Sequence, residues 1–154
     1  MSKQEAALKE RVIIAIGRAE SEIASLRNSL GSQGDNALIV ALATYDVQAL
    51  ESALRDKVLG GKVNGDTRFD IWGHGAVSNG EHQLASGANN QLIPTKNLFL
   101  KLREIVGATT PLTNVNLWAC HAGAAANDVT ALGAGSMLVS HAEEKFPYLN
   151  LNES

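Results

Sequence analysis

The sequence is poor in several kinds of residue, and each shortage excludes a class of protein. One cysteine among 154 residues excludes an internal disulfide framework and is typical of a reducing compartment. Thirteen Lys and Arg residues stand against sixteen Asp and Glu residues, and the resulting formal charge of −3 gives no basic surface for nucleic acid. No apolar run approaches the roughly 18 residues that cross a membrane. We therefore expect neither nucleic acid nor a membrane as a partner.

The N-terminus and the overall composition narrow the class further. The segment Met1–Glu5 is too polar and acidic to begin a secretory signal, so we expect a cytoplasmic protein or one delivered into the cytosol of another cell. Apolar residues make up 45% of the chain and charged residues 19%, which is ordinary for a soluble globular protein. A chain of this length forms one domain and buries a core without disulfides or a metal.

The first part of the chain shows apolar residues at helical spacing over residues 3–30, with Gly17 as the weak point of the predicted helix. The apolar positions are Leu8, Val12, Ile16, Ile23, Leu26 and Leu30. The polar stretch Gly31–Asn36 then interrupts the pattern and predicts a loop. Within one compact domain, we therefore predict an N-terminal helix and linker over residues 1–36, followed by the main body over residues 37–154.

From residue 37 onward, short apolar runs alternate with helical patterns. We predict strands over 37–43, 67–72, 115–119 and 137–139, and helices that begin after Asp46, near Pro94 and at Ala124. Ser78–Gly80 predicts a turn that leads into a small hairpin. This alternation of helices and strands is typical of an α/β sandwich with a mostly parallel sheet and right-handed crossovers.

Two of the predicted strands each end in a reactive side chain. The run Phe69–Trp72 leads into His74, which has a glycine on either side, and Val115–Ala119 leads into Cys120. The carboxyl ends of parallel strands meet at one edge of a sheet, where active sites form. A thiol beside an imidazole is the pairing that nucleophilic catalysis needs, because the base raises the thiolate fraction. The sequence therefore predicts a Cys–His site at this edge.

Several other uses of the cysteine are less consistent with the sequence. A Cys-x5-Arg phosphatase loop is excluded because Ala126, not arginine, stands six positions after Cys120. Papain-like enzymes place the cysteine before the histidine, whereas His74 comes first here. A zinc site made by Cys120 and three histidines is conceivable, but no two of these residues have a short ligand spacing. We expect His82 to be solvated in the hairpin and His121 to lie at the rim of the site.

The order and spacing of these motifs resemble the caspase-like cysteine peptidases, over about residues 37–142. The resemblance implies a caspase-like α/β/α sandwich, in which residues 37–154 form the catalytic domain. It implies a cysteine endopeptidase that acts on polypeptides through a thioester intermediate and needs no cofactor or metal. Cys120 is then the nucleophile and His74 the acid–base group. The backbone amides of Gly75 and Cys120 form the oxyanion hole in this resemblance.

The resemblance also gives expectations about specificity. Caspases carry a glutamine two residues before the cysteine, where it helps to bind a substrate aspartate, and Trp118 stands at that place here. Asp46 follows the first strand of the predicted catalytic domain and either caps the next helix or lines the specificity pocket. His141, at the end of the last strand, is a candidate for the cleft. We expect Arg, Lys or an uncharged residue before the scissile bond.

Two other functions remain open from the sequence. The same Cys–His pair serves an acyl-transfer or self-processing enzyme, for which the loop Gly31–Asn36 is a candidate cleavage region. Alternatively, the chain is a non-catalytic interaction module of this fold, or one half of an assembled enzyme. In that case a partner subunit or an activator completes the substrate cleft.

Overall fold

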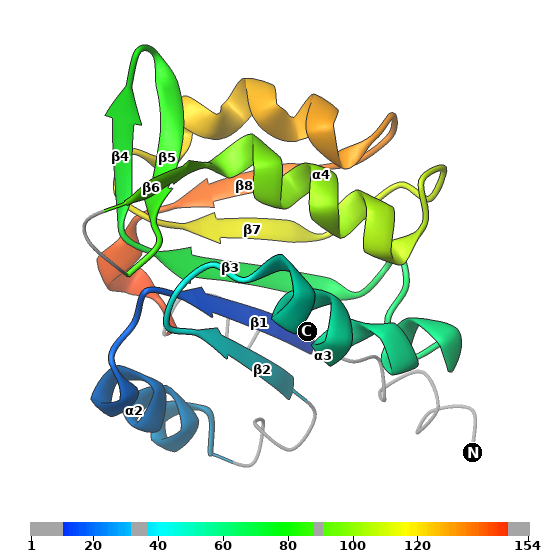
Figure 1. Ribbon diagram of the computed structural model, residues 1–154, viewed down its shortest axis with the longest axis horizontal. Coiled ribbons are helices and arrows are strands. Elements are labelled where there is room, and N and C mark those ends of the chain that lie inside the picture. Colours follow the sequence, from blue (N-terminus) through cyan, green and yellow to red (C-terminus); the bar gives the residue numbers. More distant parts are fainter. Residues whose placement is uncertain (1–10, 32–36, 88–90, 148–154) are drawn as a thin grey trace.

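A five-stranded sheet lies at the centre of the computed structural model, which describes residues 11–31, 37–87 and 91–147. The strand order is β2-β1-β3-β7-β8, and all neighbouring strands run parallel (Figure 1). The strands are β1 (Arg11–Ile16), β2 (Ala37–Leu42), β3 (Arg68–Gly73), β7 (Val115–Trp118) and β8 (Leu138–His141). The predicted α/β fold with a mostly parallel sheet is therefore confirmed.

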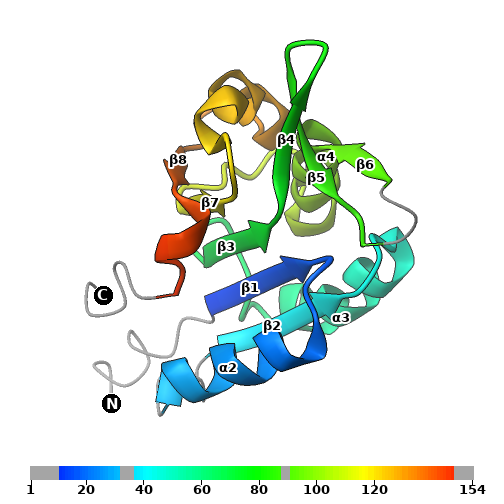
Figure 2. The same cartoon turned by 90° about the vertical axis from the view of Figure 1, so that its left-hand side faces the viewer.

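Helices cover both faces of the sheet and create three layers. They are α2 (Glu20–Leu30), α3 (Val47–Leu59), α4 (Thr95–Val106) and the 3₁₀ helices η2 (Ala122–Leu132) and η3 (Glu143–Lys145). One face packs against α3, α4 and η2, and the other packs against α2 (Figure 2). Successive residues of β1 serve opposite faces, because Val12, Ile14 and Ile16 enter the first core whereas Ile13 and Ala15 enter the second.

A second, three-stranded antiparallel sheet follows the end of β3 and projects from the molecule (Figure 2). It consists of β4 (Gly75–Ser78), β5 (Glu81–Ala85) and β6 (Leu92–Pro94). Asn79 and Gly80 connect β4 to β5 with φ angles of 52° and 78°, which suits a tight hairpin turn. The predicted hairpin is confirmed, and His74 is the single residue between the two sheets.

The predicted helix over residues 3–30 is wrong. Residues 3–10 lie outside the described part of the chain, and the remainder divides into strand β1 and helix α2. β1 is rich in β-branched residues, which favour a strand, and Gly17 ends it with a φ of 66°. Because β1 lies between β2 and β3, the segment expected to be an N-terminal helix and linker contributes a central strand of the sheet.

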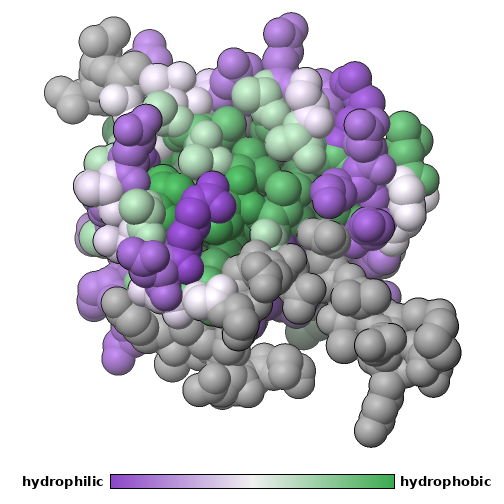
Figure 3. All heavy atoms as spheres, turned by 90° about the horizontal axis from the view of Figure 1, so that it is seen from below, coloured by the Kyte–Doolittle hydropathy of each residue, from purple (hydrophilic) through white to green (hydrophobic). Residues whose placement is uncertain are grey.

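The face that carries β2, an edge strand of the central sheet, is apolar near its middle, and hydrophilic residues gather along the parts of its rim that are coloured in Figure 3. Ala37, Leu38 and Ile39 of this strand are half-buried. Within the ranges that the structure describes, no helix has both the length and the apolar character to cross a membrane.

Candidate active site at the carboxyl edge of the sheet

Register brings His74 and Cys120 to the same edge of the sheet. Trp72 of β3 and Trp118 of β7 are paired across two adjacent parallel strands. His74 and Cys120 each lie two residues beyond their tryptophan, so both leave the sheet at the same level. The two residues singled out from the sequence are therefore neighbours at the edge where parallel sheets form active sites.

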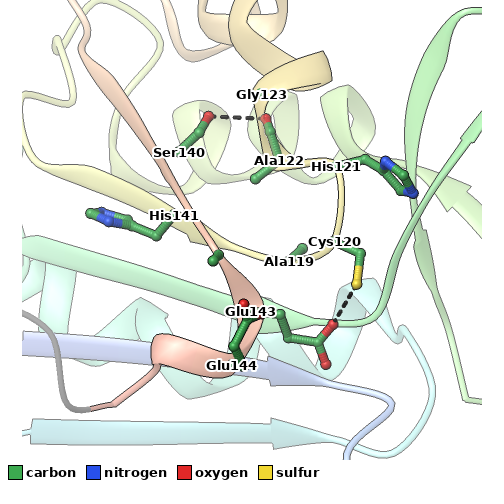
Figure 4. Close-up of a pocket in the computed structure, with 10 residues that line it drawn as sticks. Ala119, Cys120, His121, Ala122, Gly123, Ser140, His141, Glu143 and Glu144 are labelled. Carbon is green, nitrogen blue, oxygen red and sulfur yellow. Dashed lines mark hydrogen bonds between the residues drawn. The ribbon is translucent and has the colours of Figure 1, made fainter.

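Glu143 joins the two side chains. Its Oε1 accepts a hydrogen bond from the Cys120 thiol at 3.2 Å, and its Oε2 lies 3.2 Å from His74 Nδ1. The Glu143 side chain is only 15% exposed, whereas the His74 side chain is 52% exposed and Cys120 is exposed. Figure 4 shows the Glu143 carboxylate pointing from η3 toward the sulfur. A thiol, an imidazole and a carboxylate thus meet in one place.

Arg18 fixes Glu143 from the other side. This residue follows β1, and its guanidinium bonds both Oε2 of Glu143 and, at 3.0 Å, Oε2 of Glu22. It also stacks over the Trp72 ring at 4.2 Å, and only 5% of its side chain is exposed. Both the planar fork of the guanidinium and its stacking face are used, so Glu143 has a rigid anchor.

The electrostatics of the site keep the thiol protonated. The hydrogen bond to Glu143 raises the pKa of Cys120 above its usual range, and the negative charge of Glu143 acts in the same direction. Glu144 raises the pKa further, and Arg18 opposes this shift. Because the thiolate is the nucleophilic form, the described arrangement holds the cysteine in its less reactive state.

Gly75 lies against the cysteine and has room for no side chain. A Cβ at this position would overlap the carbonyl oxygen of Cys120. Ala85 donates a backbone hydrogen bond to the carbonyl of His74, which makes Gly75 and Leu84 a non-hydrogen-bonded pair of the β4–β5 ladder. The N–H of Gly75 therefore points away from β5 and is not used by that ladder.

His82 is buried, and the expectation that it is solvated is wrong. Its Nε2 lies 2.9 Å from the carbonyl oxygen of Cys120, and its Nδ1 lies 2.6 Å from Oγ1 of Thr95. Because a carbonyl oxygen only accepts, Nε2 carries the proton and the neutral ring accepts from the Thr95 hydroxyl. Burial lowers the pKa of His82, consistent with this neutral form. The buried ring thus holds the backbone carbonyl of Cys120 in place.

Two of the three residues expected to bind substrate have clear structural roles. Asp46 is exposed and caps α3, because its Oδ1 accepts from the backbone N–H groups of Gln48 at 3.0 Å and Ala49 at 3.2 Å. Trp118 is fully buried, and its Nε1 donates to Asp70 at 2.9 Å. A tryptophan inside the core has no surface for a substrate, so the expected pocket role of Trp118 is corrected to a role in the core.

His141, the third of these residues, contributes to the wall of a hollow but points away from the sulfur (Figure 4). Its ring stacks on Trp118 with 3.8 Å between ring centroids, and its Nε2 lies 2.9 Å from Oδ1 of Asn116. Burial lowers the pKa of this histidine. Its contacts hold β8 against β7. His121 is exposed, with a left-handed φ of 58°, and its ring projects away from Glu143.

A hollow of about 490 Å³ opens beside the thiol (Figure 4). One wall is the loop after β7, residues 119–123, and the other is the end of β8 with the start of η3, residues 140–144. Ser140 ties the two walls together by donating to the carbonyl of Ala122 at 2.9 Å. Small residues and His121 line the first wall, whereas Glu143 and Glu144 make the second wall acidic.

Arg18 and Glu143 were not predicted as site residues. Each follows a strand of the central sheet, which is the same signal that identified His74 and Cys120. The signal from Arg18 was hidden because β1 was assigned to a helix. Glu143 stands next to Glu144 and Lys145, and a charged cluster of this kind is typical of a solvated surface.

No three His, Cys, Asp or Glu side chains in the described residues are arranged to hold a metal ion. The zinc site considered from the sequence therefore has no such cluster in these ranges. Cys120 bonds the Glu143 carboxylate, His82 bonds the carbonyl of Cys120, and His141 bonds the Asn116 side chain.

Comparison with protein-family models, curated proteins and solved structures finds no match for this chain. The functional reading therefore depends on the chemistry of the site itself.

Proposed function

We propose that the protein is a cysteine endopeptidase of caspase-like architecture that hydrolyses peptide bonds through Cys120 and His74. The observation that carries this proposal is the meeting of the thiol and the imidazole at the two oxygens of Glu143, each at 3.2 Å. The two side chains come from adjacent parallel strands and extend equally far beyond a paired residue. Such a pair beside an open hollow has the groups that acyl transfer requires.

The reaction proceeds in two halves. The Cys120 sulfur attacks the substrate carbonyl carbon while the thiol proton passes to His74, and a C–S bond forms. The tetrahedral intermediate collapses, the C–N bond breaks, and the imidazolium protonates the leaving amine. Water then attacks the thioester carbon and gives a proton to His74. The C–S bond breaks, the carboxylic acid leaves, and the imidazolium returns its proton to the sulfur. The amides of Gly75 and Cys120 hold the oxyanion, and loss of one such donor typically costs about 3 kcal/mol of barrier.

The hollow supports a preference for Arg, Lys or an uncharged residue before the scissile bond. Glu143 and Glu144 line one wall, and a substrate carboxylate would be repelled there. Asp46 supplied this charge in the sequence-based expectation, but it is engaged in capping α3. In the proposal, Glu144 takes over the role of the acidic group, because it does not bond the thiol.

A non-catalytic interaction module is the second candidate, and one observation favours it. The thiol donates its proton to a carboxylate instead of to an imidazole, which raises the pKa of Cys120. A partner subunit that completes the cleft would find β8 at the edge of the central sheet, where Met137 and Val139 are exposed. The self-processing alternative places cleavage in the loop 31–36, most of which lies outside the described residues.

A library of fluorogenic peptides with varied residues before the cleaved bond tests the proposal. The wild-type protein should cleave members with a basic or uncharged residue, and Cys120→Ala and His74→Ala should each lose turnover. His121→Ala is the matched control, because this exposed histidine is a sequence neighbour of the nucleophile and projects away from Glu143. Turnover that persists in Cys120→Ala would disprove the mechanism. A folded wild-type protein that cleaves no library member would favour the interaction module.

A further inference from the structure

The Glu143 carboxylate occupies the space that a substrate needs. During attack, the substrate carbonyl must lie about 3–3.5 Å from the sulfur, with its leaving nitrogen within reach of the imidazole. Glu143 Oε1 already lies 3.2 Å from Cys120 Sγ, a contact marked in Figure 4. Its Oε2 lies 3.2 Å from His74 Nδ1. A scissile amide and this carboxylate cannot both occupy that position.

The same carboxylate also suppresses the chemistry of the thiol. Its Oε1 holds the thiol proton, and its charge opposes a second negative charge on the sulfur. The other charged groups around the thiol are Glu144, which acts in the same direction, and Arg18, which acts against it. Glu143 therefore blocks the site in two ways, by occupying it and by keeping the nucleophile protonated.

The contacts of the two carboxylate oxygens are unequal, and this makes the block releasable. Arg18 holds Oε2 from a buried position that is itself fixed by Glu22 and Trp72. Oε1 accepts its hydrogen bond from the thiol, whereas His74 lies against Oε2, the oxygen that Arg18 holds. A small rotation of the side chain therefore breaks the bond to Cys120 while the bond to Arg18 persists. The arginine provides a position to which the carboxylate can withdraw.

We propose that Glu143 is an autoinhibitory residue, a built-in occupant of the scissile-bond position that a peptide substrate displaces toward Arg18. This inference rests on the proposed peptidase function, because it takes the blocked position to be that of a substrate. The effect of Glu143 on the reactivity of Cys120 can, however, be tested without any peptide.

The test is the pH dependence of Cys120 alkylation by iodoacetamide, followed by mass spectrometry on the full chain. Glu143→Ala should lower the thiol pKa and raise the alkylation rate at pH 7 about tenfold, because the thiolate is the form that reacts. Glu143→Gln keeps the size of the side chain and should shift the rate in the same direction. It also keeps the test valid if the alanine variant melts at a lower temperature.

Glu20→Ala is the control, because it removes an exposed carboxylate two residues after Arg18 without removing a bond to the thiol. It should change the alkylation rate by less than about twofold. An effect equal to that of Glu143→Ala would overturn the inference, because general charge and not occupancy would then explain it. Unchanged or slower alkylation of Glu143→Ala and Glu143→Gln would also overturn it.

Arg18 gives a second, opposite test. Arg18→Met should slow alkylation, because the charge of Glu143 near the sulfur is then uncompensated, and adding Glu143→Ala to it should restore fast alkylation. Part of the Arg18→Met effect should persist in the double variant, because Arg18 also lowers the thiol pKa directly. An effect of undiminished size there would contradict the inference.

Failure of the two proposals can be told apart. Faster alkylation of Glu143→Ala without cleavage of any peptide would retain the block and reject the peptidase. Peptide turnover by the wild type with no effect of Glu143→Ala on alkylation would do the reverse.

Discussion

Asp70, within the sheet, and Glu143, at its edge, are both paired with arginine, but their remaining partners differ. Asp70 of β3 is fully buried and accepts from Arg11 at 2.7 Å, from Arg68 at 3.0 Å and from the Trp118 indole at 2.9 Å. Glu143 has one arginine, and its other contacts are the thiol and the imidazole. Asp70 is enclosed by guanidinium and indole N–H donors from three adjacent strands, and these donors do not take part in the proposed reaction. Glu143 contacts a thiol and an imidazole, which exchange protons in that reaction.

This difference shows how one sheet can carry both a stabilising buried ion-pair cluster, around Asp70, and a reactive site. A buried carboxylate is tolerated only when its partners satisfy it, and removal of one member leaves the others unpaired. The Asp70 cluster therefore fixes the relative positions of β1, β3 and β7. The carboxyl ends of the same strands carry Arg18, His74 and Cys120, so these side chains start from a rigid base.

The largest effect on stability should come from removing the Asp70 carboxylate. Asp70→Ala removes the acceptor of the Arg11 guanidinium and of the buried Trp118 indole N–H, and should lower the free energy of unfolding by about 3–5 kcal/mol. Glu143→Ala should lower it by only about 1 kcal/mol, because Arg18 retains Glu22. Urea denaturation of both variants measures the two values. Equal losses would mean that the carboxylates do not differ in the way described.

A second test concerns the close approach at the reactive edge. A methyl group at Gly75 would overlap the carbonyl of Cys120, so Gly75→Ala should displace the loop and reduce turnover about 100-fold, or roughly 2.7 kcal/mol of barrier. Gly123→Ala is the control, because a Cβ there meets nothing within 4 Å among the described residues, and it should retain turnover. Steady-state kinetics on one cleaved peptide compares them. Similar losses in both variants would dissociate the effect from the Gly75–Cys120 contact.

The reactive edge also contains His82, whose ring is buried and bonded at both nitrogens. Its contribution to stability should be smaller than that of Asp70 and should depend on pH. Burial lowers its pKa in the folded state below the unfolded value of about 6.5, so the unfolded chain binds the extra proton first. Stability is therefore complete above pH 6.5 and falls as the pH decreases toward the folded pKa. His82→Gln should cost about 1–2 kcal/mol at pH 7.5 and make the curve flatter below pH 6.5.

Urea denaturation at several pH values between 5 and 8 gives this curve for both proteins. His141, whose pKa burial also lowers, contributes a fall in the same direction and leaves a residual slope in the variant. A variant curve as steep as that of the wild type would contradict the assignment to His82.

The smallest effect should come from Asp46. Asp46→Ala removes two hydrogen bonds at the start of α3 and should cost about 1 kcal/mol of stability, with no change in turnover or in preference among peptides. Asp46→Ser, which keeps a capping oxygen without the charge, should recover most of the stability. A change in peptide preference in both variants would instead return Asp46 to the specificity pocket.

The sequence allowed the sheet edge with His74 and Cys120 to be predicted, because each follows a short apolar run whose end is visible locally. It did not allow the separation of β1 from α2, since a β-branched run followed at once by a true helix mimics one long helical pattern. The pairing of Arg18 with Glu143 joins residues 125 positions apart, and no local pattern records that contact. Trp118 was assigned to a pocket because it stands where caspases carry a glutamine, and nothing in the neighbouring sequence reveals its hydrogen bond to Asp70.

The shared register of β3 and β7 has a consequence for engineering. The separation of His74 from Cys120 is set by the two-residue extension of each chain beyond the Trp72–Trp118 pair, not by the long segment between them. Foreign sequence inserted at the Asn79–Gly80 turn should therefore leave the alignment of the two side chains intact. One residue added between Trp72 and His74 would instead turn the imidazole to the opposite face. The Asn79–Gly80 turn should therefore accept insertions, whereas the number of residues between Trp72 and His74 cannot change.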